Sequence, residues 1–509
     1  MRVVLSCLFA SLLLVAAPAR ADWHVAKTRH FIIYADEKPE RLRAFADRLE
    51  KFDKAIRLIR DMPDPEIGDG NRLTVFMVNS EAAVQRLAND KSGMIGGFYV
   101  PRASGSIAFV PRTAGGEHER AENILFHEYA HHLMLSHSEA VFPEWLVEGF
   151  AEFMATARFD KKGSVVLGAA PVHRAWGLFS GNPLPLELLI TGDYGKLSQE
   201  QREAIYGRGW LLAHYLTFEP SRQGQLSRYV TTLGKGVKPR EAAVAAFGDL
   251  KQLEKETEAY LRRKRLTTLE VAAHALVTAP AEIARLSPGA AAVMPLRIES
   301  KRGVNRTTAG PLAAKVRAIA AAHPGDPLVQ VTLAEAEYDA GQYQAAEAAA
   351  DRALAADPRN PEAMVYKGRA LAARASSAAG EQRNALFTAA RKIFIAANQL
   401  DTEDPEPLLE YYKSFLDQGV RPTANAIAAL HYASDLAPQD LGLRMNSARA
   451  YLADGKIKEA RRRLEPVAYN PHGRRLADAA KAVIQKIDAG DVKGALSSGE
   501  APDQEGEGR

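Results

Sequence analysis

Two histidines four positions apart, in the stretch HEYAH at residues 127–131, restrict the fold of this chain more than any other feature. An α-helix turns by about 100° per residue, so His127 and His131 lie one turn apart on the same face, where both imidazoles can bind one ion. Glu128 lies beside this pair, where its carboxylate can reach a metal-bound water instead of the metal. The pattern predicts a helix that carries part of a divalent-metal site suited to hydrolysis.

The position of a third ligand decides the type of site, because a catalytic zinc ion takes three protein ligands and keeps one open position. Glu148 follows His131 by 17 positions, in the stretch PEWLVEGFAEF at residues 143–153, which predicts a second helix. Acidic residues recur every fourth position on one face of this helix, at Glu144, Glu148 and Glu152. An acidic stripe between large apolar residues favours a functional role, with a solvated face as the alternative.

His137 competes with Glu148 for the third position. It lies ten positions after His127, which is the third-ligand spacing of the metzincins. That signature needs glycine at position 134, because the chain must leave the helix sharply there, and this chain has Met134. If the helix continues, His137 points roughly 240° away from His131 and cannot reach the same ion. We favour Glu148 and keep His137 as the alternative.

HEYAH followed by WLVEGFAEF resembles the gluzincin zinc peptidases, and most closely the bacterial peptidase MA-like family. The resemblance covers residues 23–263 and implies an α+β, zincin-like (thermolysin-like) catalytic domain with Zn²⁺ as its cofactor and a peptide or protein as its substrate. It implies zinc ligands His127, His131 and Glu148, with Glu128 as general base. It also implies that Glu152 orients a ligand histidine, because a metal-bound imidazole needs a partner for its other nitrogen.

Two runs, GGFYV and SIAFV, predict a hairpin at residues 96–110, directly before the histidine-bearing helix. In zincin folds the strand before this helix forms an open sheet edge on which an extended peptide docks. The match in this chain predicts substrate contacts at Ser106, Ile107, Ala108 and Phe109. An ordinary core hairpin is the alternative.

The run YGRGWLLAHYL at residues 206–216 predicts a helix in which Tyr206, Trp210 and His214 share one face. Gluzincins use a Tyr or His downstream of the metal helix to bind the oxyanion of the tetrahedral intermediate, so the resemblance makes Tyr206 or His214 a candidate. A packing stripe is the alternative.

Residues 1–21 predict a secretory signal peptide, because Arg2 precedes an apolar run and the segment ends in the small residues of Ala19-Arg20-Ala21. Cleavage removes Cys7, the only cysteine, and lowers the formal charge from +4 to +2. We expect an exported bacterial protein, periplasmic or secreted, whose mature chain has no membrane span and no nucleic-acid partner.

The second half of the chain is rich in alanine and divided by proline turns. The spacing is 34 residues from Pro327 to Pro361 and from Pro407 to Leu441, and 46 residues across an insertion near residues 375–384. A 34-residue helix-turn-helix period resembles tetratricopeptide repeats and predicts an all-α solenoid, with residues 287–323 as a diverged first repeat. Such a surface binds peptides or a protein partner, or it only caps the catalytic domain.

The predicted organisation has five parts: a signal peptide at 1–21, a metallopeptidase domain at 22–265, a linker at 266–286, helical repeats at 287–490 and a disordered tail at 491–509. Predicted elements of the second part are strands at 30–35 and 73–78, a helix at 39–60 and a strand at 164–168. The predicted function is zinc-dependent peptide hydrolysis. The rival is a non-catalytic envelope scaffold in which the repeats carry the function, and the presence of Glu128 favours the enzyme.

Overall fold

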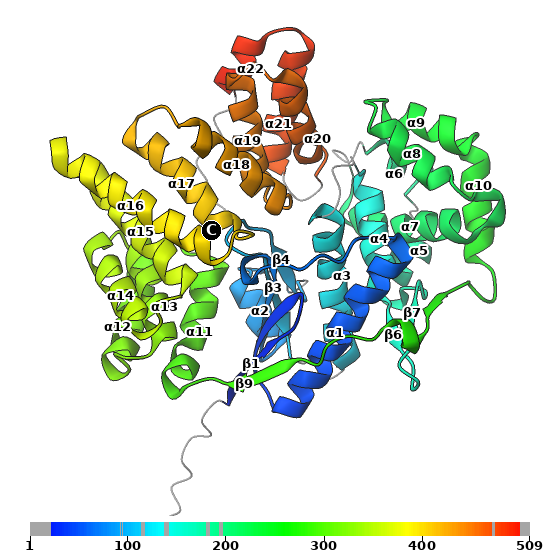
Figure 1. The fold of residues 1–509 in the computed structure, drawn as a ribbon. Helices are drawn as coiled ribbons and strands as arrows, with labels where there is room; N and C mark the ends of the chain where they lie inside the picture. The colour runs from blue at the N-terminus through cyan, green and yellow to red at the C-terminus, as the bar shows by residue number, and fades with distance from the viewer. Residues whose placement is uncertain are drawn as a thin grey trace, which may run out of the picture.

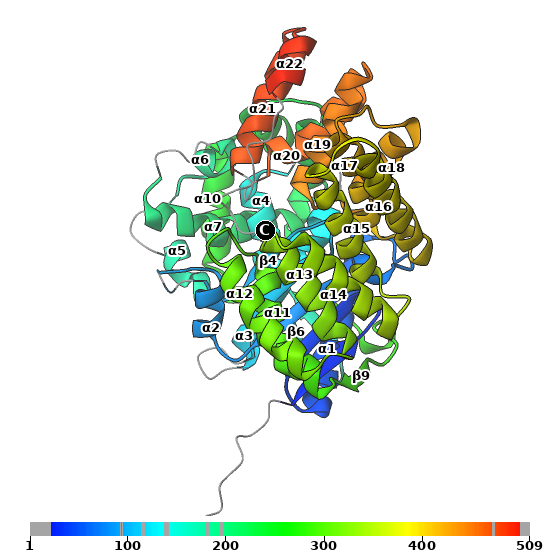
Figure 2. The same ribbon diagram turned by 90° about the vertical axis from the view of Figure 1, so that its left-hand side faces the viewer.

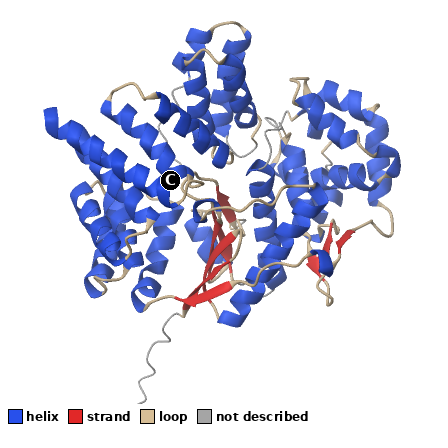
Figure 3. Cartoon of the chain, in the orientation of Figure 1, coloured by secondary structure: helices blue, strands red, loops and turns tan. Residues whose placement is uncertain are grey.

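The computed structural model describes residues 22–91, 93, 95–112, 118–136, 142–179, 184–192, 197–470 and 474–498. The N-terminal half combines β-sheet with helices, and the C-terminal half is helical (Figures 1 and 3). Within the described residues, no helix has the length and apolar character needed to cross a membrane. The predicted signal peptide at 1–21 lies outside the described residues.

Six strands form the central sheet in the order β4-β5-β3-β2-β1-β9. β3 pairs parallel with both β2 and β5, whereas β4 pairs antiparallel with β5, β1 with β2, and β9 with β1. The strands are β1 (Trp23–Lys27), β2 (Phe31–Asp36), β3 (Leu73–Val78), β4 (Phe98–Val100), β5 (Ile107–Pro111) and β9 (Glu282–Arg285). The strand predicted at 73–78 is confirmed, and the strand predicted at 30–35 begins one residue later.

Helices cover both faces of this sheet, because side chains along each strand alternate between two cores. In β3, Val75 and Met77 belong to a core shared with α1 and α3, while Phe76 belongs to the core on the other face. α2 and α11 cover that other face, where Met294 and Ile298 of α11 are buried with the strands. A helix of the C-terminal half therefore completes the core of the N-terminal half.

The N-terminal half contains ten α-helices among its described residues, and the predicted helix at 39–60 is confirmed. They are α1 (Pro39–Arg60), α2 (Glu81–Leu87), α3 (His118–Ser136), α4 (Glu144–Ala155), α5 (Ala175–Phe179), α6 (Leu186–Thr191), α7 (Gln199–Phe218), α8 (Gln225–Leu233), α9 (Pro239–Phe247) and α10 (Leu250–Leu261). Two glycines set the crossing of α4 and α7, since a Cβ on Gly149 would lie 2.4 Å from the carbonyl carbon of Gly209.

Residues 266–286 are not the predicted linker. β8 (Leu269–Val271) pairs with β7 (Val165–Leu167), which pairs with β6 (Arg158–Phe159) in a second sheet, and β9 lies on the edge of the central sheet. The interpretation as a linker is wrong because strands of three or four residues carry almost no periodic pattern of their own and gain their stability from distant partners.

Successive helices pack against one another through the C-terminal half. They are α11 (Pro288–Arg302), α12 (Ala309–Ala322), α13 (Pro327–Asp339), α14 (Tyr343–Ala356), α15 (Pro361–Ser376), α16 (Gly380–Leu400), α17 (Pro405–Gln418), α18 (Ala424–Leu436), α19 (Leu441–Ala453), α20 (Ile457–Ala468), α21 (Arg474–Asp488) and α22 (Val492–Ser498). The predicted turns are confirmed, because Asp326, Asn360, Asp404 and Asp440 cap the helices that follow them. The predicted insertion falls at the end of α15 and the start of α16, which is 21 residues long.

The predicted disordered tail begins too early. Residues 492–498 form α22, and Ala495 is buried in a core with side chains of α19, α20 and α21. The polar composition of the last residues concealed a short helix that contacts its neighbours through few apolar side chains. Residues 499–509 lie outside the described part of the chain.

The loop between β4 and β5 contacts the helical array. The backbone N–H of Ala103 donates to Asp440 Oδ2 over 2.9 Å, and Gln439 Nε2 donates to Ser106 Oγ over 3.2 Å. Nearby, Asn71 Nδ2 donates to the carbonyl oxygen of Glu403 over 2.6 Å. Turns that precede α17 and α19 thus hold two loops of the N-terminal half.

We expect a chain of residues 22–263 to lack a cooperative thermal unfolding transition. This truncation removes β8 and β9 and exposes the sheet face that α11 covers, including Phe76, so the core loses a large part of its apolar burial. Circular dichroism during heating measures the transition, and a chain of residues 22–498 is the control that should unfold like the full mature chain. Cooperative unfolding of 22–263 would show that the two halves fold independently.

Candidate metal centre

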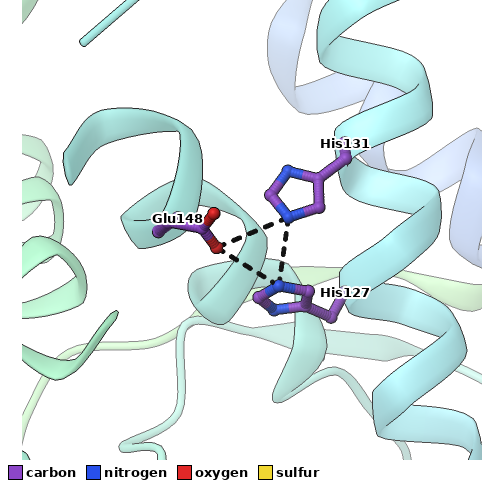
Figure 4. A group of neighbouring side chains, drawn as sticks. All are labelled: His127, His131 and Glu148. Atoms are coloured by element: carbon purple, nitrogen blue, oxygen red, sulfur yellow. Dashed lines mark hydrogen bonds and ion pairs between the residues drawn. The ribbon is translucent and has the colours of Figure 1, made fainter. Parts of the chain in front are cut away.

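Three side chains from α3 and α4 converge on one point (Figure 4). The Nε2 atoms of His127 and His131 lie 3.1 Å apart, and Glu148 Oε2 lies 3.4 Å from the first and 3.5 Å from the second. The four-residue spacing turns both imidazoles to the same face of α3, and α4 supplies the carboxylate from the other side. The three predicted ligands therefore lie together, as one of two groups in the described residues with metal-ligand geometry.

The distances among these three atoms fit a zinc ion. Zinc–nitrogen and zinc–oxygen distances of about 2.0–2.1 Å with tetrahedral angles place neighbouring ligand atoms about 3.3 Å apart. The observed separations of 3.1, 3.4 and 3.5 Å lie around this value. Two imidazoles and one carboxylate also leave a fourth position open, which is the donor set of a catalytic site and not of a structural one.

Glu152 lies behind His127, on the side away from the three converging atoms. Its Oε1 is 3.3 Å from His127 Nδ1, so the carboxylate can fix the tautomer and orientation of that imidazole, as the resemblance implied. Burial alone would lower the pKa of His127, but hydrogen bonds with Glu148 and Glu152 outweigh it and raise the pKa to about 10. The two carboxylates therefore favour a positive charge here, which a proton or a divalent cation can supply.

Sequence reasoning missed the residues that hold Glu152. His173 Nε2 lies 2.9 Å from Glu152 Oε2, and Arg174 Nε donates to Glu152 Oε1 over 2.8 Å. Both come from a short 3-10 helix, η2 (Val172–Arg174), which directly precedes α5. Burial would raise the pKa of Glu152, but its bonds with His127 and His173 lower it well below its usual value. His173 and Arg174 have no regular spacing from the metal motif, so the sequence did not indicate that they contact Glu152.

The predicted general base, Glu128, lies on α3, and the predicted oxyanion residue, Tyr206, lies on α7. Glu128 is half-buried on α3, one position after His127. The ring of Tyr206, on α7, lies 6.1 Å from the ring of His127 between centroids. Burial, followed by the negative charge of Glu148, raises the pKa of Tyr206, and Glu128 adds to this effect. Tyr206 therefore stays protonated and can donate a hydrogen bond near the site.

His214 is a packing residue, so its assignment as an oxyanion candidate is wrong. It is fully buried, its Nε2 lies 2.9 Å from the carbonyl oxygen of Gly168, and its Nδ1 accepts from Tyr260 over 2.9 Å. Burial lowers its pKa to about 4. Both ring nitrogens are engaged in the core, whereas the ring of Tyr206, two turns earlier on α7, lies 6.1 Å from the ring of His127.

The predicted open edge is also wrong, because Ser106, Ile107, Ala108 and Phe109 lie in the interior of the sheet. β5 pairs with β3 on one side and with β4 on the other, and all four side chains are buried. The alternative interpretation, a core hairpin, is the correct one for these residues. β4 lies at the edge of the sheet, and its Tyr99 hydroxyl is 2.8 Å from His132 Nδ1 on α3.

The alternative third ligand, His137, lies outside the described residues. α3 continues as a helix through Met134 to Ser136, and Met134 packs against the core. The sharp turn that the metzincin spacing requires at position 134 is therefore not formed.

A second buried group, His30, Glu50 and Asp53, is a structural network. His30 Nδ1 lies 2.9 Å from Glu50 Oε2, and Asp53 accepts from Arg57 Nε over 2.8 Å and from the Tyr129 hydroxyl over 2.6 Å. These bonds tie α1 to the turn before β2 and to Tyr129 of α3, the residue after Glu128. Because Arg57 supplies a positive charge to Asp53, this group has the character of a satisfied ion-pair network.

No protein-family model matches the chain, and no curated protein matches it. Among solved structures, the chain is similar to a thermophilic tetratricopeptide-repeat protein from Thermus thermophilus. The identity is 18% and the TM-score 0.31, over 35% of this chain and 91% of that chain. The function proposed below rests on the side-chain geometry and not on this likeness.

Proposed function

We propose that this chain is a zinc-dependent peptidase of the gluzincin type that hydrolyses peptide bonds in peptide or protein substrates. The observation that carries the proposal is the convergence of His127 Nε2, His131 Nε2 and Glu148 Oε2 within 3.1–3.5 Å of one another. Glu152 supports it from behind His127, where its carboxylate can hold the imidazole in the orientation that ligation needs.

Zn²⁺ held by His127, His131 and Glu148 would polarise the scissile carbonyl and lower the pKa of a water molecule at the open position. Glu128 would act as the general base toward the attacking water and as the proton donor to the leaving amine. Tyr206 would donate a hydrogen bond to the carbonyl oxygen of the substrate. Glu152, fixed by His173 and Arg174, keeps the His127 ring in the orientation that ligation needs.

The rival function, a non-catalytic scaffold, has less support from the site. A structural zinc site closes its coordination with four protein ligands, and these three donors leave a position open. The general base assigned to Glu128 and the hydrogen-bond donor assigned to Tyr206, whose ring lies 6.1 Å from that of His127, have no use in a closed site. Both residues support an enzyme.

In this proposal the helical array stabilises the catalytic half. Its polar side chains form buried pairs with one another, such as Arg297 with Glu362 at 2.7 Å and Arg369 with Glu410 at 3.0 Å, and its turns hold the loop between β4 and β5. A protein partner, which helical repeats commonly bind, would use the surfaces of the array that remain exposed. The proposal includes export to the bacterial envelope. N-terminal sequencing of the exported protein tests this part, because removal of the signal peptide should leave Asp22 as the first residue.

We expect the purified mature chain to hydrolyse an unstructured peptide, to lose this activity in the presence of a zinc chelator, and to regain it when Zn²⁺ is added. Mass spectrometry of the products measures cleavage. Retention of full activity in a strong chelator, with no zinc detected in the protein, would exclude the metal mechanism. A zinc-loaded chain that cleaves nothing would favour the scaffold.

A further inference from the structure

Three large apolar side chains are exposed on one short segment, formed by η2 and α5. Val172, Trp176 and Phe179 have exposed fractions of 76%, 65% and 67%. They stand at positions i, i+4 and i+7, so a helical backbone aligns them in one stripe. Isolated exposed apolar residues are common, but an aligned stripe that includes Trp and Phe is a sign of a binding surface.

The stripe has a fixed position, because the opposite side of the segment packs tightly on α7. A Cβ built on Gly177 would lie 3.1 Å from the Cα of Ala204, and a Cβ on Gly207 would lie 3.1 Å from Leu178. Gly177 and Leu178 are buried, while the stripe faces outward. In Figure 1, α5 lies beside α7, and in Figure 2 it lies at the outer edge of the molecule. The three apolar side chains are therefore exposed on a segment whose other side is firmly packed.

The same segment contacts residues that support the candidate metal centre. His173 and Arg174, between Val172 and Trp176, both contact Glu152, which contacts His127. The Arg174 guanidinium also lies 4.5 Å from the centroid of the Tyr206 ring. The apolar stripe is thus joined, through His173 and Arg174, to Glu152 behind His127 and to the ring of Tyr206.

We propose that Val172, Trp176 and Phe179 bind bulky apolar side chains of an extended polypeptide whose scissile bond lies at the His127–His131–Glu148 centre, an inference that rests on the proposed function. Rigid aromatic side chains on a packed element provide contact area at a low entropic cost. The occupant is apolar, because the three exposed side chains of the stripe are apolar. An anionic membrane surface fits less well, since both basic side chains of the segment are already bound to Glu152.

The test measures binding without turnover. Zinc-loaded mature chain carrying Glu128→Gln is titrated against two fluorescent Gly-Ser peptides that are identical except for one central Phe or Ser. We expect the Phe peptide to bind about tenfold more tightly, and the double change Trp176→Ser with Phe179→Ser to abolish that difference. Val277→Ser removes an equally exposed apolar side chain elsewhere and is the matched control. Zinc titration and circular dichroism confirm that every variant keeps its site and fold.

The outcomes distinguish failure of the apolar binding surface from failure of the proposed peptidase function. If the double variant keeps the full preference for Phe, the apolar surface does not bind substrate, whatever the hydrolysis assays give. If the preference depends on the stripe but the chain with Glu128 cleaves neither peptide, the binding surface stands and the peptidase function fails. If the stripe instead controls dimerisation in sedimentation, or pelleting with anionic vesicles, while peptide binding is unaffected, another copy or a membrane is the occupant and the inference is overturned.

Discussion

Glu128→Gln is expected to reduce peptide hydrolysis by at least about 100-fold, because the amide keeps the shape of the side chain but cannot accept the proton of the attacking water. Zinc affinity should be unchanged, since Glu128 lies one position beyond His127 and is not among the converging donors. Steady-state cleavage of a fluorogenic peptide measures the rate, and competition with a chromogenic chelator measures the affinity for zinc.

Two further variants serve as comparisons for Glu128→Gln. Glu128→Asp keeps a carboxylate but withdraws it by one methylene, so it should retain more activity than Glu128→Gln. Glu40→Gln removes an exposed acid on α1 and should leave the rate unchanged. Full turnover in Glu128→Gln would reject this residue as the base. Loss of zinc in the same variant would instead mean that Glu128 helps to hold the ion.

The convergence of the three candidate ligands could be predicted from the sequence because its geometry is local. A four-residue spacing fixes the relation of His127 and His131 on any helix, and the acidic stripe on the next helix limited the third ligand to few choices. The helix at 39–60 and the strand at 73–78 were predictable for the same reason, since an amphipathic period is a property of consecutive residues. The sequence did not reveal how α4 packs on α3, which is visible only in the structure.

The predictions from the sequence are wrong where residues far apart in the chain determine the structure. β9 pairs His24 with Arg285, and nothing within Glu282–Arg285 specifies that partner. The edge of the sheet likewise depends on whether β4 or β5 is outermost, which a hairpin sequence does not reveal. Tyr206 and His214 looked equivalent on one helical stripe. They are eight residues apart, about 12 Å along a helix, so only one of them can lie beside a given ion.

Glu148→Ala is expected to cause the largest loss of zinc affinity among the acidic residues of α4. Glu148 Oε2 lies within 3.5 Å of both ligand nitrogens, so its removal leaves two imidazoles and replaces an anionic donor with water. Glu152 contacts His127 at Nδ1, the ring nitrogen that faces away from the three converging atoms, and loss of such a supporting carboxylate weakens metal binding by about 10–100-fold. The affinity of Glu148→Ala should therefore fall well below that of Glu152→Ala.

Zinc titration of four variants decides the type of site. Glu144→Ala, one turn before Glu148 on the same stripe, is the matched control, and His137→Ala tests the alternative ligand; both should bind zinc almost as the unaltered chain does. Circular dichroism must show intact helices in each variant, because Glu148 and Glu152 are buried. Zinc retained by Glu148→Ala but lost from His137→Ala would mean that the chain leaves α3 differently from the helix seen through Ser136. The third ligand would then be a histidine, and the role assigned to Glu152 would have no basis.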